Sequence, residues 1–165
     1  MITREIYLAL GANLGDRVES LRAAVGHLSA FVGVERISSV WDTAPQLVKD
    51  QPRFLNAALI GVTTLGPFAL LHAIKRLEAE LGRRPGLRYG PRAIDIDILF
   101  YAEWQVDSQE LTIPHPLLGE RAFVLAPLAE IAPSLRHPRL GRTMTELLAQ
   151  VPAQDIRRLD VRLTR

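Results

Sequence analysis

Apolar and polar residues follow two different periods along the chain, and their order predicts the fold. Runs with β-branched residues or strict alternation predict four strands, at 6–10, 34–41, 54–63 and 94–100. Apolar stripes at helical spacing predict one helix that Asp16 can cap and a second that runs from Pro67 to Gly82. The residues that we expect on the buried faces of these helices are Val18, Leu21, Val25, Leu28, Phe68, Leu71, Ile74, Leu77 and Leu81.

The predicted order of elements is strand, helix, strand, strand, helix, strand. This βαββαβ order is typical of the ferredoxin-like arrangement, in which two helices cover one face of an antiparallel sheet and leave the other face available. We therefore expect an α+β fold with C-terminal additions. Those additions are a hairpin near 104–106, a strand or short helix pair at 123–131 and 143–151, and a final strand within 155–165. No repeat or boundary interrupts the chain, so we predict one domain, 1–165.

The strand predicted at 94–100 carries two carboxylates, Asp95 and Asp97, on one face. Alternation should place Ile94, Ile96, Ile98 and Phe100 on the opposite face. Neighbouring carboxylates repel each other unless a cation lies between them, and hard oxygen ligands suit Mg²⁺. An alternating Ile/Asp pattern is also typical of a half-exposed edge strand, so this pair alone leaves both interpretations open.

Arginines near the start of this strand favour the metal interpretation. Arg88 and Arg92 bracket Gly90 and Pro91, a pair that favours a turn. Guanidinium groups bind phosphate in a planar, bidentate manner. Carboxylates that hold a metal beside such groups indicate phosphate-transfer chemistry.

Other residues can reach the same open face. Phe54 and Asn56 point the same way on their strand and would suit a flat heteroaromatic ring, although Phe54 is equally compatible with a core position. Phe123 follows Arg121 and offers a second ring, with the same alternative. His115 lies between two prolines, where it could contact phosphate, bind a metal or cap a loop.

Composition excludes several classes of function. The 165 residues are 48% hydrophobic with a net charge of +2, which fits a folded domain. No cysteine is present, so thiol chemistry and Cys-ligated zinc are excluded. No apolar run approaches the roughly 20 residues that span a bilayer, and we expect a soluble cytoplasmic protein that binds no membrane. The glycine turn at 11–15 lacks the features of a dinucleotide-binding loop or a P-loop.

Several segments resemble those of a known family. Residues 88–99 read Arg-Tyr-Gly-Pro-Arg-Ala-Ile-Asp-Ile-Asp-Ile-Leu, and this stretch resembles the signature of the 6-hydroxymethyl-7,8-dihydropterin pyrophosphokinases of folate biosynthesis. The segments 10–15, 50–58, 114–116 and 121–128 are also similar to that family. The resemblance implies transfer of the β,γ-diphosphate from ATP, as co-substrate, to the hydroxymethyl group of the pterin, leaving AMP. It also implies two Mg²⁺ ions and no obligate protein partner.

The resemblance also implies roles for individual residues. Asp95 and Asp97 would bind the metal ions, and Arg83 and Arg92 would act with them in catalysis. The residues that would form the ATP site are Glu78, Arg83, Arg84, Arg88, Arg92, Ile98, Thr112, His115 and Arg121. Those that would form the pterin site are Thr43, Ala44, Pro45, Phe54, Asn56, Tyr89, Asp95 and Phe123. The chain departs from the family pattern in having Ala44 where proline is common and Tyr89 where tryptophan is common.

Two other classes of function compete with this interpretation. A βαββαβ sheet can present aromatic residues to single-stranded RNA, but only 6% of the residues are aromatic and no ribonucleoprotein motif is present, so we expect no nucleic-acid partner. A metal-dependent nuclease or nucleotidyltransferase could use the same aspartate pair, and product analysis would distinguish it.

Overall fold

The computed structural model describes residues 2–45, 50–82, 93–152 and 154–163. Along the chain its elements are β1 (Arg4–Ala12), α1 (Arg17–Leu28), β2 (Gly33–Ile37), β3 (Trp41–Thr43), β4 (Phe54–Thr63), α2 (Pro67–Glu80), β5 (Asp95–Tyr101), β6 (Val106–Asp107), β7 (Thr112–Ile113), a short 3-10 helix (Leu118–Glu120), α3 (Ala122–Ile131), α4 (Met144–Gln150) and β8 (Ile156–Arg158). No helix within these described ranges is long and apolar enough to cross a membrane.

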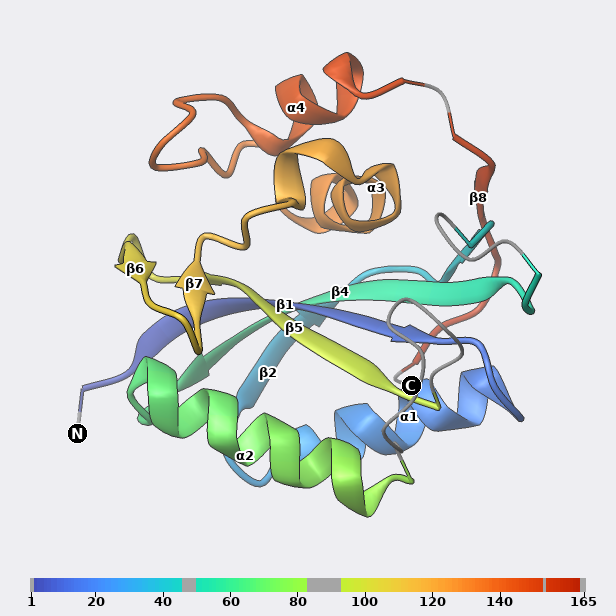
Figure 1. The fold of residues 1–165 in the computed structure, drawn as a ribbon, viewed down its shortest axis with the longest axis horizontal. Helices are drawn as coiled ribbons and strands as arrows, with labels where there is room; N and C mark the ends of the chain where they lie inside the picture. Colours follow the sequence, from blue (N-terminus) through green and yellow to red (C-terminus); the bar gives the residue numbers. More distant parts are fainter. Residues whose placement is uncertain (1, 46–49, 83–92, 153, 164–165) are drawn as a thin grey trace.

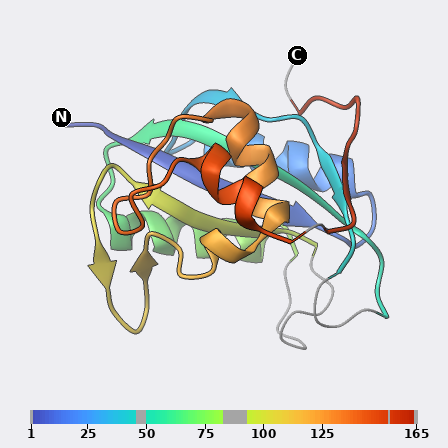
Figure 2. The ribbon, with the colours of Figure 1, turned by 90° about the horizontal axis from the view of Figure 1, so that it is seen from above.

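An antiparallel sheet forms the centre of the fold, in the order β5-β1-β4-β3-β8, and β2 also pairs with β4. Helices α1 and α2 lie against one face of the sheet, and α3 and α4 lie over the other (Figure 1). Seen from above, α3 and α4 extend across the middle of the sheet (Figure 2). The predicted α+β, ferredoxin-like fold is confirmed. The face that we expected to stay available is covered over part of its area, because the C-terminal pair 123–131 and 143–151 folds as helices.

Helix α2 buries the predicted stripe except at its start, where Leu70 and not Phe68 is buried, while Leu71 and Leu81 pack partly buried against the core. Leu70, Ile74 and Leu77 are at most 3% exposed, whereas Phe68 is 39% exposed. With 3.6 residues per turn, Phe68 lies about 120° around the helix from Ile74, which places it outside the stripe that faces the sheet. Helix α1 begins as predicted, because the side chain of Asp16 accepts a hydrogen bond from the backbone N–H of Glu19 (3.1 Å).

A β-bulge in β5 changes which face its last residues occupy. Tyr7 pairs with Phe100, but the next residue, Leu8, pairs with Ile98, so Leu99 is an extra residue on β5. Phe100 therefore turns to the α3 side, where its ring meets that of Tyr7 edge-on at 5.8 Å. The prediction that Phe100 shares a face with the isoleucines is wrong, because strict alternation ends at the bulge.

The predicted strand at 34–41 is two strands, β2 and β3, which pair with different parts of β4. Ser38 lies in the break, where its hydroxyl accepts from Ala58 N–H and its own N–H donates to the Ala58 carbonyl. Just beyond, Glu130 of α3 accepts hydrogen bonds from Ser39 N–H, Ser39 Oγ and Trp41 Nε1 at 2.9–3.0 Å. This carboxylate attaches α3 to the start of β3.

Candidate active site

The sheet register places the predicted site residues on one face. Asp95 lies opposite Gly11, and Gly11 lies opposite Asn56, so the two side chains project on either side of a glycine. Asp97 lies opposite Ala9, and Phe54 lies opposite Thr43. Because residues that oppose each other on antiparallel strands point the same way, all of these side chains face the α3 side. The face has small residues in its centre and polar or aromatic ones around them.

Burial and neighbouring negative charge both act on the aspartate pair. Burial, which is the largest cause, and the charges of Asp95 and Glu78 together raise the pKa of Asp97 to about 7. Lys75 and Arg121 act in the opposite direction, but they do not outweigh it. A bound divalent cation would favour the charged form of both carboxylates, so the pair suits such an ion.

The donor set fits Mg²⁺. Within the described ranges, no three histidine or acidic side chains gather as a metal-binding group. The pair alone would offer carboxylate oxygens from two residues, and the remaining positions would be left to water or substrate. Mg²⁺ commonly binds in this way, through one or two carboxylates and the phosphates of a substrate.

Glu78 supports the strand that carries the aspartates. It comes from α2, on the opposite face, and its Oε2 accepts a hydrogen bond from the Ile96 N–H (2.8 Å). β5 is at the edge of the sheet, so an N–H that points away from β1 needs a partner from another element. The carboxylate is 2% exposed, with Lys75 Nζ 3.4 Å from Oε1. Glu78 thus holds β5 at Ile96, the residue between Asp95 and Asp97. Its contact with ATP stays a prediction.

His115 is held as a neutral hydrogen-bond donor near the same carboxylates. Its Nδ1 accepts from the Leu117 N–H (3.2 Å), so the ring proton belongs on Nε2. The backbone N–H of His115 donates to the carbonyl of the bulge residue Leu99 (3.1 Å). Burial, as the largest cause, and the charge of Arg121 together lower the pKa of His115 to about 4, although Asp95 opposes the change. At neutral pH the imidazole therefore carries no charge.

Arg121 and Phe123 lie at the start of α3. The guanidinium carbon of Arg121 lies 5.5 Å from the centroid of the Phe123 ring, within the range of a cation–π contact. Both side chains are partly exposed. Phe123 packs against the apolar cluster, whereas the charge of Arg121 acts on the pKa values of Asp97 and His115.

The amide of Asn56 is fixed before any ligand arrives. Its Nδ2 donates to Thr43 Oγ1 at 2.6 Å, and both residues are buried. Its Oδ1 lies so close to Gly11 that a Cβ atom added there would be 2.9 Å away. Our sequence reasoning missed this role of Gly11, although a glycine inside a strand is a signal of close approach.

The remaining predicted residues have different outcomes. The side chain of Ile98 is 4% exposed and packs in the core with α1 and α2, so only its backbone is left to contact a nucleotide. Thr112 lies half-buried in β7. Ala44 and Pro45 follow β3, and the Ala44 N–H donates to the carbonyl of Asp155 (3.0 Å). The predicted residues that lie outside the described part of the chain are Arg83, Arg84, Arg88, Tyr89 and Arg92.

Comparison with known proteins identifies related sequences. Residues 7–133 match the family model of the 7,8-dihydro-6-hydroxymethylpterin-pyrophosphokinases. The chain is 45% identical to the 2-amino-4-hydroxy-6-hydroxymethyldihydropteridine pyrophosphokinase of Methylorubrum extorquens, over 93% of this chain and 98% of that protein. It is 49% identical to a mitochondrial folate synthesis bifunctional protein of Arabidopsis thaliana over 77% of this chain. It spans only 23% of that longer protein.

The fold is also similar to solved structures. A crystal structure of Plasmodium falciparum HPPK-DHPS with pteroate superimposes with a TM-score of 0.75 at 18% sequence identity. The match covers 90% of this chain and 42% of that one. At this identity the likeness concerns the fold.

We expect Gly11→Ala to destabilise the protein by about 1–3 kcal/mol, because the new methyl group overlaps the Asn56 amide. The measurement is denaturant unfolding. Gly26→Ala, in α1 with nothing within 4 Å of an added Cβ, is the matched control and should be neutral or stabilising. In an Asn56→Ala background, the cost of Gly11→Ala should largely disappear, and an undiminished cost would contradict the proposed overlap.

We expect Asp97→Asn to stabilise the protein at pH 8 in EDTA by about 1–3 kcal/mol. The pKa of Asp97 is near 7 in the folded state and about 4 when unfolded. Folding therefore takes up a proton between these values, so the wild type loses stability as the pH rises from 4 to 7, and the variant escapes that loss. The advantage should shrink toward pH 4. Exposed Asp107→Asn should give no such pH-dependent gain; an equal gain there would refute the account.

Proposed function

Because the chain belongs to the 7,8-dihydro-6-hydroxymethylpterin-pyrophosphokinase family, we propose that it transfers the β,γ-diphosphate of ATP to the hydroxymethyl oxygen of 6-hydroxymethyl-7,8-dihydropterin. The products are AMP and the pterin diphosphate. The observation that carries the proposal is the joint placement of Asp95 and Asp97 with Phe54 and Asn56 on one face of the sheet. A phosphate-binding group and a ring-binding group thus lie within the span of three neighbouring strands, β5, β1 and β4.

Asp95 and Asp97 are the residues that would hold Mg²⁺, with two ions as the family resemblance implies. When bound, the metal neutralises charge on the phosphate oxygens and makes the hydroxyl of the pterin more acidic. We assign no side chain as general base. Phosphoryl-type transfer depends mainly on in-line positioning and on electrostatic stabilisation of the transition state, which this pair serves.

The pterin would lie between the rings of Phe54 and Phe123. Stacking of this kind contributes about 1 kcal/mol beyond burial of the ring. Asn56 would orient the edge of the pterin, since its hydrogen bond to Thr43 already fixes the rotation of the amide. The backbone of Thr43, Ala44 and Pro45 would complete that edge, and Tyr89 would cover the ring.

The phosphates of ATP would be bound by His115 and Arg121, together with Arg83, Arg84, Arg88 and Arg92. A neutral His115 would donate from Nε2 to a phosphate oxygen. Arg121 supplies the fixed positive charge beside it. Glu78, Ile98 and Thr112 would contribute to the nucleotide side of the site, and Arg83 and Arg92 would act in the transfer itself. We propose that one domain, 1–165, carries out the whole reaction.

Product analysis tests this proposal. With ATP, Mg²⁺ and the pterin alcohol, we expect AMP in equal amount to pterin diphosphate. Asp95→Ala should lower kcat by about 10²-fold or more, because it removes charge stabilisation in the transition state. Its fold should survive, since one member of a repelling pair is gone.

Asp107→Ala, an exposed aspartate in β6, is the control and should keep full activity. Release of ADP would indicate an ordinary kinase and would refute the proposal. AMP and pyrophosphate formed without the pterin would indicate hydrolysis of ATP, and pyrophosphate with a nucleotidylated acceptor would indicate a nucleotidyltransferase; either result would also refute the proposal.

A further inference from the structure

The C-terminal segment 154–163 lies along the edge of the sheet that carries Thr43. Its strand β8 pairs with β3, with Ile156 opposite Thr43. Farther along, Leu163 is 7% exposed and packs in the core between the sheet and helices α1 and α2. This segment follows the residues that match the family model, which end at 133. It is therefore a part of this chain for which the proposed reaction gives no role.

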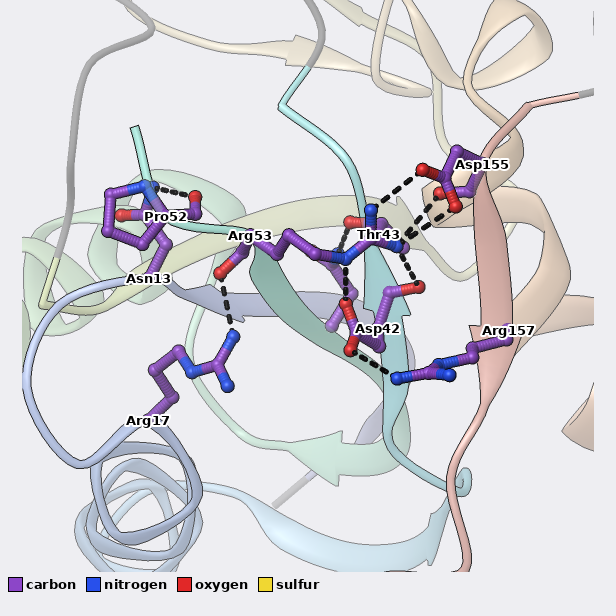
Figure 3. A network of polar contacts seen from close by, with 9 residues as sticks. Asn13, Arg17, Asp42, Thr43, Pro52, Arg53, Asp155 and Arg157 are labelled. Atoms are coloured by element: carbon purple, nitrogen blue, oxygen red, sulfur yellow. Dashed lines mark hydrogen bonds and ion pairs between the residues drawn. The ribbon is translucent and has the colours of Figure 1, made fainter. Parts of the chain in front are cut away.

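One residue of this segment, Asp155, joins the two stretches of chain that carry pterin-contact residues (Figure 3). Its carboxylate accepts two hydrogen bonds from the Arg53 guanidinium, at 2.7 and 3.1 Å. Its carbonyl accepts from the Ala44 N–H at 3.0 Å. The same guanidinium donates through Nε to Asp42 Oδ1 at 2.6 Å. Asp155 thus links the end of β3 to the start of β4.

These linked residues are next to the proposed ring-binding groups. Arg53 directly precedes Phe54, and Asp42 and Ala44 flank Thr43. The backbone at Arg53 is held from a second side, because Arg17 Nη1 donates to its carbonyl at 2.9 Å. A shift of this backbone would move Phe54 relative to the Thr43–Asn56 hydrogen bond.

The exposure of the Arg53–Asp155 ion pair indicates how much it contributes to stability. The side chain of Asp155 is 71% exposed and that of Arg53 is 36% exposed. Ion pairs this exposed contribute little to overall stability. A bidentate contact between a guanidinium and a carboxylate nevertheless fixes their relative orientation, and Arg53 lowers the pKa of Asp155, as expected for such a pair. An effect on local geometry is therefore expected without a comparable effect on stability.

We propose that Asp155 is a positioning residue for the pterin: through Arg53 and Ala44 it fixes the spacing between Thr43 and Phe54. This inference rests on the proposed function, since it assigns the pterin side of that site a support from the C-terminal segment. Asp155 would act through Arg53 and Ala44 rather than by contact with a substrate.

The test compares Asp155→Ala with Asp160→Ala, its matched control, an exposed aspartate of the same segment outside the network. The assay measures kcat and the KM of each substrate in the full-length protein. For Asp155→Ala we expect the pterin KM to rise three- to tenfold, while the ATP KM and the melting temperature stay at wild-type values. High salt should reduce the difference by weakening the wild-type ion pair. Asp160→Ala should match the wild type.

Combination with Arg53→Gln separates positioning from a general effect of the segment. Asp155→Ala should add less than twofold to the pterin KM in that background, because the partner is already absent. An unchanged pterin KM in Asp155→Ala, or an equal rise in the KM of both substrates with a lower melting temperature, would overturn the inference. A wild-type protein that forms no AMP from ATP and the pterin would instead overturn the proposed function, and this inference with it.

Discussion

Two like charges held side by side on an edge strand are the constraint on which this structure depends. Asp95 and Asp97 face the same way because β5 alternates regularly up to Ile98. Hydrogen bonds on both sides of β5 hold the strand in place despite the repulsion between the two carboxylates. β1 pairs with it through the ladder, and Glu78 accepts the outward N–H of Ile96. Because β5 is hydrogen-bonded on both sides, a bound cation would relieve the repulsion without displacement of the strand.

The face around this pair is divided into an apolar half and a polar half. The bulge at Leu99 turns Phe100 toward α3, where it joins Tyr7 in the second core cluster. In the polar half, the same face of the sheet carries small residues, polar groups and the ring of Phe54. Helix α3 borders both halves, because the helix packs on the cluster while Arg121, which directly precedes it, acts on the pKa of Asp97. The start of α3 therefore forms one border of the proposed site.

Local patterns predicted the features that depend on short-range physics. The spacing of two in β5 placed both aspartates on one face, and the Asp16 cap began α1 where expected. What sequence reasoning missed depends on pairing between distant segments. The bulge in β5 exists only relative to β1, and the break at Ser38 exists only relative to Ala58 on β4. The closeness of Gly11 to Asn56 likewise appears only after β1 and β4 are in register.

The central claim is that the aspartate pair binds a nucleotide through a divalent cation. Calorimetric titration with a non-hydrolysable ATP analogue, with and without Mg²⁺, tests it most directly. The wild type should bind the analogue much more tightly with Mg²⁺. The double variant Asp95→Asn/Asp97→Asn should bind it with the same weaker affinity in both conditions. A double variant that keeps the full gain from Mg²⁺ would contradict the account.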